Sequence, residues 1–326
     1  MSDRISIATF TTFALTACAA ATTAATAQSY PAKPIRFIIP FPPGGPTDLM
    51  GRTAADRLAR AWNVQVVADN RAGAGGNIGT EMCAKAPPDG YTLCMMTVAQ
   101  SISPAIYKKL GFDPVKDFSP VTLMALMPSL LTAHPTLPVK NVKELVALAK
   151  SKPGELTYAS TGNGTSPHML MEMLKAMSGI NVIHVPYKGQ APAVVDQIAG
   201  QIQLAFNTAT TVLPYVQAGK MKAIAISTKE RFPPMPDLQT VAEGGIKGFD
   251  GSSWQAVVMP SNTPREIVGK AYQELSSMLK SQDVRAKFLA QGALASGMPP
   301  EEFTAFVKLE IDKWARVAKF ANLRLD

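Results

Sequence analysis

Hydrophobic positions along the chain form short runs that alternate with helical segments. Ile35 to Phe41 is a β-branched run, and a helix is expected from about Asp48 to Trp62. The alternation continues with a strand at 64–68, a helix at 77–85 and a strand at 91–97. Short continuous apolar runs between helices are typical of parallel β-α-β units that are covered on both faces. The first hundred residues therefore predict an α/β sheet.

The same pattern returns in the middle of the chain and predicts a second α/β sheet. Strands are expected at 156–160, 182–185, 202–206 and 222–227, and helices at 144–151, 167–177, 191–199 and 210–217. Extended apolar runs at 122–132 and 252–259 flank this region, and long amphipathic helices are expected at 265–281 and 301–320. A chain that leaves one domain, builds another and returns needs two crossover strands. These runs predict a hinge with a cleft beneath it.

The N-terminal residues are typical of an export signal. Arg4 precedes an apolar, uncharged run over residues 5–17, and Ala-Thr-Ala at 25–27 matches an A-x-A cleavage site. The stretch at 15–18 also resembles a bacterial lipobox, which would leave Cys18 lipidated. Soluble export and a lipid anchor at Cys18 both stay open, and either one places the mature protein in the periplasm.

Composition and charge narrow the class of protein. With 326 residues, of which 47% are hydrophobic, the chain is long enough for two domains with buried cores. Its net charge of +8 can attract anionic solutes, or it can serve solubility alone. The Lys and Arg residues are scattered and form no basic run, so nucleic-acid binding is not expected.

Cys83 and Cys94 are the cysteines that follow the expected cleavage site. An exported chain meets an oxidising compartment, where disulfides persist. We expect Cys83 late in a helix and Cys94 in the next strand, and a helix packed on its own sheet can bring the two together. Sequence does not fix the direction of either side chain, so a disulfide and two free thiols are both left open.

Three glycine-rich loops each precede a predicted helix, at 41–48, 71–79 and 160–168. The start of a helix exposes unpaired N–H groups, and the helix dipole adds positive potential there. Such a loop can hold a carboxylate or a phosphate without Lys or Arg. A single loop would more often be structural, but three of them from two domains predict a shared anion site.

Motifs for cofactor binding and catalysis fail at identifiable positions. A dinucleotide fingerprint in the second loop would need glycine where Ile78 stands. Ser160 lacks the first glycine of a nucleophile elbow, and the histidines show no zinc-ligand spacing. We therefore expect no cofactor, no metal and no enzymatic activity. A secreted hydrolase that uses Ser160 and His168 is kept as an alternative.

Four residues near the loops each allow two interpretations. Asp48 is either a first-turn charge that caps its helix or a ligand contact. His168 either bonds to backbone at a helix start or lies near the ligand. Tyr187 forms a cleft wall or anchors its own loop, and Lys188 faces the cleft or is a solvated loop residue.

Eight segments together resemble the Bug family, the TctC-like extracytoplasmic receptors of tripartite tricarboxylate transporters. They span nearly all of the mature chain in order, and together they are specific although each alone is weak. The segments are YPAKPIR (30–36), PPGGPTD (42–48), NRAGAGGNIG (70–79), PDGYTL (88–93), GNGTSPH (162–168), HVPYKG (184–189), PDLQTV (236–241) and SW (253–254). The third loop departs from the family, because it begins with Ala159-Ser160-Thr161-Gly162, where Ser-Ser-Gly is frequent.

The resemblance implies a type II periplasmic-binding-protein fold, in which two α/β domains joined by two crossover strands close like a flytrap. Residues 1–27 are then a signal peptide, 28–125 with 253–326 form domain 1, and 126–252 form domain 2. It also implies capture of a small organic acid and delivery to membrane subunits of a tripartite tricarboxylate transporter, by a protein that is a monomer. A receptor that reports to a membrane sensor kinase is the alternative with the same binding step.

In such receptors the first-helix loop and a facing loop of domain 2 hold a ligand carboxylate, largely through backbone groups and bridging waters. Carried over, the first loop supplies Pro43, Gly44, Gly45, Pro46 and Thr47, and the facing loop supplies Thr161, Gly162, Asn163, Gly164, Thr165 and Ser166. The other candidate ligand-binding residues are Asp48, Gly76, Asn77, Gln100, His168, Tyr187 and Lys188. We expect Gly44→Val or Gly45→Val to weaken ligand affinity more than stability.

Overall fold

The computed structural model describes residues 30–324, so the expected signal peptide and Cys18 lie outside the described residues. The strands are β1 (Ile35–Ile39), β2 (Val66–Asn70), β3 (Thr92–Thr97), β4 (Phe118–Ala133), β5 (Thr157–Ser160), β6 (Ile183–Pro186), β7 (Leu204–Thr208), β8 (Lys222–Ile226), β9 (Ser252–Pro260) and β10 (Leu294–Met298). The helices are α1 (Pro46–Trp62), η1 (Ala74–Gly76), α2 (Asn77–Ala84), α3 (Val98–Ile106), α4 (Val142–Ser151), α5 (Ser166–Ser178), α6 (Gln190–Ile198), α7 (Ala209–Gln217), α8 (Arg265–Lys280), α9 (Gln282–Ala290) and α10 (Pro300–Phe320).

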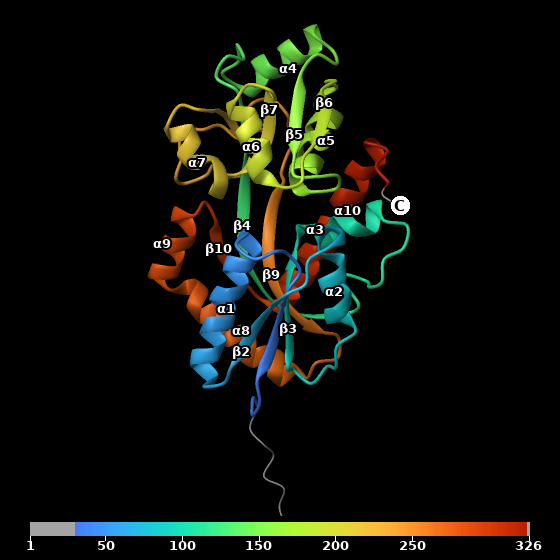
Figure 1. Ribbon diagram of the computed structural model, residues 1–326, viewed down its shortest axis with the longest axis vertical. Helices are drawn as coiled ribbons and strands as arrows, with labels where there is room; N and C mark the ends of the chain where they lie inside the picture. The colour runs from blue at the N-terminus through green and yellow to red at the C-terminus, as the bar shows by residue number, and fades with distance from the viewer. Residues whose placement is uncertain (1–29, 325–326) are drawn as a thin grey trace, which may run out of the picture.

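Two lobes share the long strand β4 (Figure 1). The strand order is β2-β1-β3-β9-β4-β7-β5-β6, and β8 and β10 also pair with β4. Up to Pro128, β4 pairs with β9 and β10 in the first lobe, and from Ser129 onward it pairs with β7 and β8 in the second lobe. The first lobe holds β1 to β3, β9 and β10, and the second holds β5 to β8. The predicted two-domain α/β architecture is confirmed, whereas the predicted domain boundaries stay a prediction.

The direction of the strands differs from the expectation of purely parallel units. β1 runs parallel to β2 and β3, and β5 runs parallel to β6 and β7, as expected. However, β9 is antiparallel to both β3 and β4, and β4 is antiparallel to β7. The reason is topological: β4 leaves the first lobe, β9 returns to it, and both are strands of its sheet.

Pro128 lies inside β4 without ending it. The extended run predicted at 122–132 is part of one strand, which continues through Pro128 from Phe118 to Ala133. Pro128 is opposite Ser252 at the end of the β9 ladder, and the β7 ladder begins at Ser129. Proline lacks an N–H, so it is tolerated where the strand changes partner.

Four elements were not expected from the sequence: η1, α3, α9 and β10. The helix α3 follows β3 directly, because Thr97 accepts a hydrogen bond from Ala99 N–H and Gln100 completes a capping box. The apolar run of β3 continues into α3 without a glycine or proline to mark the boundary. Ser281 is the C-cap residue of α8 and the N-cap residue of α9, whereas the sequence predicted only that a helix ends there.

The disulfide left open by the sequence is formed in the structure between Cys83 in α2 and Cys94 in β3. Their Cα atoms are 6.3 Å apart, and both residues are buried. The helix α2 thus packs on its own sheet and is joined to it covalently.

The C-terminal helix α10 packs against α3 in the first lobe and α5 in the second. On its inner face, the buried carboxylate of Glu310 accepts hydrogen bonds from the indole N–H groups of Trp254, at 3.1 Å, and Trp314, at 3.0 Å. Trp254 lies in β9, next to the crossover, and its ring meets Phe303 and Phe306 edge to face. A buried polar contact therefore fixes α10 to the returning strand.

Candidate functional site

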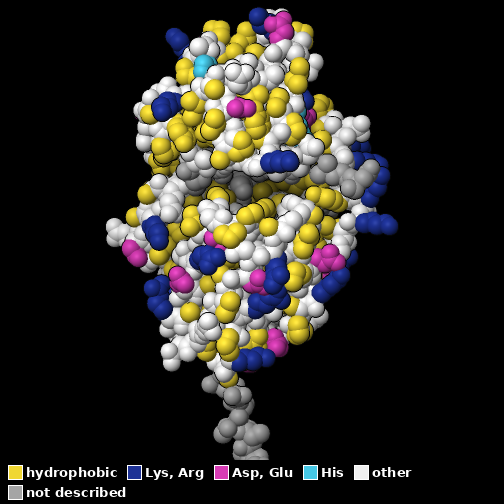
Figure 2. All heavy atoms as spheres, in the orientation of Figure 1, with side chains coloured by type: hydrophobic (Ala, Val, Ile, Leu, Met, Phe, Trp, Pro, Cys, Tyr) yellow, Lys and Arg dark blue, Asp and Glu magenta, His cyan; other side chains and the backbone are white. Residues whose placement is uncertain are grey.

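A cavity of about 230 Å³ lies between the two lobes and is lined by residues of both. We call it the interlobe cavity. Figure 2 shows the molecule hollowed across its middle at this level. The candidate residues that line it are Pro46, Thr47, Thr161, Asn163, Gly164, Thr165 and Ser166. The cavity thus brings together the predicted loops that follow β1 and β5.

The first loop brings the N-terminus of α1 to the interlobe cavity. Gly45 is the N-cap residue of α1, Pro46 is its first residue, and no side chain caps this end. Proline at this position loses nothing, because its missing N–H would be unpaired anyway. Pro46 and Thr47 line the cavity, while Pro43, Gly44 and Gly45 are not among its lining residues.

Gly44 and Gly45 differ in backbone conformation. Gly44 has a φ of +84°, and a Cβ atom added to it would meet nothing within 4 Å. Gly45 has a φ of −82°, which any residue can adopt, and an added Cβ would lie 3.9 Å from the Pro42 carbonyl oxygen. Glycine is therefore required for conformation at Gly44 but not at Gly45.

Asp48 holds the first loop in place. Its carboxylate, 3% exposed, accepts hydrogen bonds from Gly44 N–H, Arg52 Nε and Asn70 Nδ2 at 2.9 to 3.0 Å. Burial alone would raise the pKa of Asp48, but the hydrogen bonds from Arg52, Gly44 and Asn70 outweigh it and lower the pKa. We call Asp48, Arg52 and Asn70 the carboxylate cluster. Of the two interpretations of Asp48, the structure favours the structural one.

The second loop reaches the cavity through Gly75, and Gly76, Asn77 and Gln100 are not among its lining residues. Asn77 Oδ1 accepts a hydrogen bond from the Ser103 hydroxyl. Gln100 Oε1 accepts hydrogen bonds from the Thr97 N–H and hydroxyl, while its buried Nε2 has no partner. Asn77 thus contacts α3 at Ser103, while Gln100 caps the start of α3.

The third loop brings the N-terminus of α5 to the opposite side of the interlobe cavity. Thr165 is the N-cap residue, and no side chain caps this end either. Its hydroxyl donates to the Gly162 carbonyl oxygen at 2.7 Å instead. The neighbouring Ser166 Oγ is buried and has no hydrogen-bond partner. Donor groups of this loop are therefore left for a molecule in the cavity.

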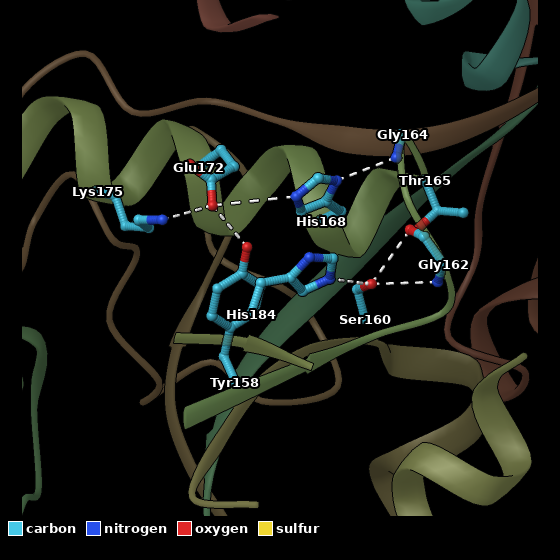
Figure 3. A network of polar contacts seen from close by, with 9 residues as sticks. All are labelled: Tyr158, Ser160, Gly162, Gly164, Thr165, His168, Glu172, Lys175 and His184. Atoms are coloured by element: carbon cyan, nitrogen blue, oxygen red, sulfur yellow. Dashed lines mark hydrogen bonds and ion pairs between the residues drawn. The ribbon is translucent and has the colours of Figure 1, made fainter. Parts of the chain in front are cut away.

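Behind the third loop lies a pair of histidines, of which His168 is buried and His184 is half-buried (Figure 3). His168 Nδ1 accepts the Gly164 N–H at 3.0 Å, so its own hydrogen is on Nε2. His184 Nε2 lies 2.6 Å from the Ser160 hydroxyl, which also contacts the backbone of Gly162. The two imidazole rings stack with their centroids 4.0 Å apart. We call Ser160, His168 and His184 the histidine cluster, and its contacts fix the backbone of the third loop.

The histidine cluster is uncharged at neutral pH. Burial lowers the pKa of His168 to about 3, and His184 and Lys175 add to this effect. Burial also lowers the pKa of His184, against the opposing influence of Glu172. Glu172 accepts hydrogen bonds from Tyr158, at 2.6 Å, and Lys175, at 2.7 Å, on the far side of the rings.

Ser160 does not fit the nucleophile of the hydrolase alternative. The hydrolase alternative requires a hydrogen bond between Ser160 and His168, but the Ser160 hydroxyl is bonded to His184 instead. The residue is 1% exposed and is not among those that line the interlobe cavity. Its hydroxyl serves the third loop.

Tyr187 and Lys188 do not line the interlobe cavity. The Tyr187 hydroxyl donates to Asp196 at 2.7 Å, which agrees with the interpretation as a loop anchor. Lys188 is exposed, as a solvated loop residue would be.

Several lining residues were not expected from the sequence. They are Phe41, Gly75, Thr97, Val98, Ala99, Ser103, Ile106, Tyr107, Met127, Ser129, Pro167, Gln190, Thr208, Ser253 and Gln255. Most belong to α3 and the residues at its two ends or to the crossovers in β4 and β9, while Phe41, Gly75 and Pro167 lie in the three predicted loops. The sequence predicted that the crossover runs lie above a cleft, and this could have identified Ser129, Ser253 and Gln255 as lining residues. The β3–α3 junction has no glycine-rich loop and gave no such signal.

Comparison with known proteins places the chain in a family. Residues 50–323 match the Tripartite tricarboxylate transporter family receptor, TctC. The chain belongs to this family. BugT of Bordetella pertussis is 35% identical over 305 residues, 92% of each chain. A Rhodopseudomonas palustris structure with adipate superposes with a TM-score of 0.82 at 35% identity and covers 91% of this chain and 100% of that one. MatC from Rhodopseudomonas palustris with bound malate gives 0.78 at 31% identity, with 88% and 99% covered.

Membership of the TctC family confirms the predicted resemblance and the periplasmic-binding-protein fold. The family and its structures are solute-binding receptors and not enzymes, so the chain is a receptor. Family members are periplasmic binding proteins. Within residues 30–324, no helix combines the length and apolar character needed to cross a bilayer.

Proposed function

We propose that this TctC receptor captures a small organic anion through a carboxylate in the interlobe cavity and delivers it to membrane subunits of a tripartite tricarboxylate-type transporter. The observation that carries the proposal is the pair of helix N-termini, α1 and α5, that reach one cavity from opposite lobes without side-chain caps. Unpaired N–H groups and the dipoles of two helices favour an anion between them.

The ligand then connects the lobes. A carboxylate that contacts Thr47 in α1 and Ser166 in α5 makes both contacts only when the lobes are close together. Binding therefore favours the closed arrangement by the difference in affinity between the open and closed states. Adipate and malate in the two Rhodopseudomonas palustris structures support carboxylates as the ligand class.

Calorimetric titration of ligand-stripped protein tests the binding step. The protein is unfolded in denaturant, dialysed and refolded, and then titrated with mono-, di- and tricarboxylates. At least one carboxylate should bind. When it is present at 100 times its Kd, it should raise the free energy of unfolding by about 2.7 kcal/mol. The absence of any binding across the panel, with folding verified by circular dichroism, would refute the proposal.

Delivery to a transporter is tested in the producing cell. Deleting the gene should abolish uptake of the radiolabelled ligand, and a copy with Ser166→Asp should not restore it, because the added carboxylate repels the anion. Normal uptake with a lost transcriptional response would instead indicate the sensor-kinase alternative.

The mass of the purified mature protein distinguishes cleavage after Ala27 from a lipid anchor at Cys18. Light scattering tests the expected monomer.

A further inference from the structure

No cationic side chain is found among the described residues that line the interlobe cavity. The helix N-termini that reach the cavity supply partial positive charge, but this field falls off within about one helix turn. An anion that approaches through solvent is attracted over longer distances by full charges, whose effect weakens as salt is added. The attraction of an anionic ligand toward the cavity therefore depends on the charged residues around it.

The charged residues next to the cavity lining are mostly cations. In the described part of the chain, the charged side chains within two positions of a lining residue are those of Asp48, Lys108, Lys109 and Lys188. Asp48 is 3% exposed, and its carboxylate is bonded to the guanidinium of Arg52. The other three are lysines, so the segments that form the lining bring positive charge with them.

Lys188 lies beside the third loop, on the second-lobe side of the cavity. The Tyr187 N–H donates to the carbonyl oxygen of Ser160 at 3.0 Å, and the Tyr187 hydroxyl donates to Asp196. Two positions after Lys188, Gln190 begins α6 and lines the cavity. The backbone on both sides of Lys188 is therefore fixed next to the cavity.

The side chain of Lys188 extends into solvent. It is exposed, and no described residue forms a hydrogen bond or an ion pair with its ammonium group. On the first lobe, Tyr107 lines the cavity as the C-cap residue of α3, and the exposed Lys109 follows two positions later. Figure 2 shows Lys or Arg side chains at the upper edge of the hollow between the lobes and at its right-hand end. Positive charge thus flanks the cavity from both lobes.

An exposed lysine acts on an anion differently from a residue inside the cavity. Its ammonium group stays hydrated, so a charge pair at this position contributes little to the stability of the bound complex. Charges at the rim of a binding site change mainly the association rate and its dependence on salt, whereas buried contacts change the dissociation rate. Lys109 and Lys188 are therefore placed to affect how fast an anion arrives.

We propose that Lys109 and Lys188 steer the anionic ligand into the interlobe cavity and accelerate its capture without contacting it in the bound state. This role rests on the proposed function, because the lysines attract only an anion. The sequence left Lys188 open between a residue that faces the cleft and a solvated loop residue. Steering combines exposure to solvent with a role in ligand capture.

Surface plasmon resonance on the ligand-stripped mature receptor, captured through a C-terminal tag, measures both rates. The probes are acetate, malate, adipate and citrate, and the acid that binds most tightly is used for the kinetics. Raising NaCl from about 10 to about 200 mM shortens the Debye length from about 30 to about 7 Å. The association rate constant should then fall at least about threefold, while the dissociation rate constant stays within about 1.5-fold.

Reversing the charge of Lys188 gives the decisive comparison. Lys188→Glu should lower the association rate constant about fivefold at low salt and leave the dissociation rate constant within about 1.5-fold. Lys109→Glu should lower the association rate constant about threefold in the same way. Lys150→Glu is the matched control, since Lys150 is an exposed lysine in the last turn of α4, at the outer end of the second lobe (Figure 1). It should leave both rates unchanged.

Two results for Lys188→Glu would overturn steering. Faster dissociation with normal association would make Lys188 a direct ligand contact, and an effect no larger than that of Lys150→Glu would make it a solvated loop residue alone. In both cases the acid still binds, so the proposed function stands. If none of the four acids binds to the wild-type receptor, with folding verified by circular dichroism, steering and the proposed function are both contradicted.

Discussion

The loops before α1 and α5 face one cavity but are held in place by opposite kinds of chemistry. The first is fixed by the carboxylate cluster, in which an ionised Asp48 accepts from Arg52, Asn70 and backbone. The third is fixed by the histidine cluster, in which neutral His168 accepts from Gly164. Both leave a helix N-terminus open to a ligand. An open helix N-terminus is thus held in place once by a charged group and once by neutral groups, and acid should affect the two differently.

Removing the Asp48 carboxylate should have the largest effect on the comparison. Asp48→Ala leaves Gly44 N–H and Asn70 without their acceptor, which should lower the free energy of unfolding by about 3 kcal/mol. Urea unfolding measures the loss, and carboxylate affinity should fall with it as the first loop loosens. Asp56→Ala, at an exposed site on the same helix, should change stability by no more than about 0.5 kcal/mol. Equal effects of the two substitutions would contradict the role of the carboxylate cluster.

Mild acid should act through the histidine cluster. A free histidine has a pKa near 6.5, and in the folded protein the pKa of His168 is about 3, so below pH 6.5 the unfolded chain binds a proton that the folded chain excludes. The stability that the folded protein gains from holding His168 uncharged is fully present above pH 6.5 and is lost as the pH falls toward 3. Stability should drop by about 2 kcal/mol between pH 7 and pH 5.

Unfolding in urea at pH 7.5 and pH 5 measures this slope. His168→Phe should make it shallower, and His134→Phe, outside the cluster, should leave it unchanged. The lowered pKa of Asp48 confines its own loss of stability to pH values below about 4. A stability that is constant between pH 7.5 and pH 5 would show that the histidine cluster does not exclude protons as described.

The two glycines of the first loop allow a smaller test. Gly44→Val places a β-branched residue at a φ of +84°, which should cost about 1 to 2 kcal/mol of stability. Gly45→Val meets no such strain at a φ of −82°, so its stability should stay within about 0.5 kcal/mol. The sequence predicted that either substitution weakens ligand affinity more than stability. We now expect this only of Gly45→Val. Calorimetric titration of the folded Gly45→Val protein decides it, since unchanged affinity would make this position only part of a turn.

Single hydroxyl groups should produce the smallest effect. Ser166 Oγ has no partner in the protein, so Ser166→Ala should leave stability within about 0.5 kcal/mol and weaken carboxylate binding about fivefold. Thr47→Ala makes the matching change in α1 and should weaken binding to a similar extent. A loss on only one side, measured by calorimetry, would show that the ligand depends on one loop more than on the other.

Local sequence signals predicted the parts of the site that local chemistry builds. Glycine and proline before a predicted helix pointed to Pro46, Thr47, Thr161 and residues 163–166, which line the interlobe cavity. The lining residues Val98, Ile106 and Tyr107 were missed, because their position depends on how α3 packs on the first lobe and no turn residue marks where β3 ends.

Side-chain direction was the other limit of the sequence. His168 was recognised as either a backbone contact or a ligand contact, and only the position of His184, from a different strand, reveals the stack behind the loop. Gln255 was missed for the same reason, since its burial beside the cavity depends on the register of β9 with β4.

The carboxylate of Glu310 places two of the chain's three tryptophans in one polar contact beside the crossover strand. Indole emission depends on the electric field around the ring, and Trp254 precedes Gln255 of the cavity in β9. Closure of the lobes around a ligand should therefore shift the protein's own fluorescence without an attached dye. The third tryptophan, Trp62, lies at the end of α1 and provides a background signal. We therefore expect the receptor's own tryptophan emission to report its occupancy.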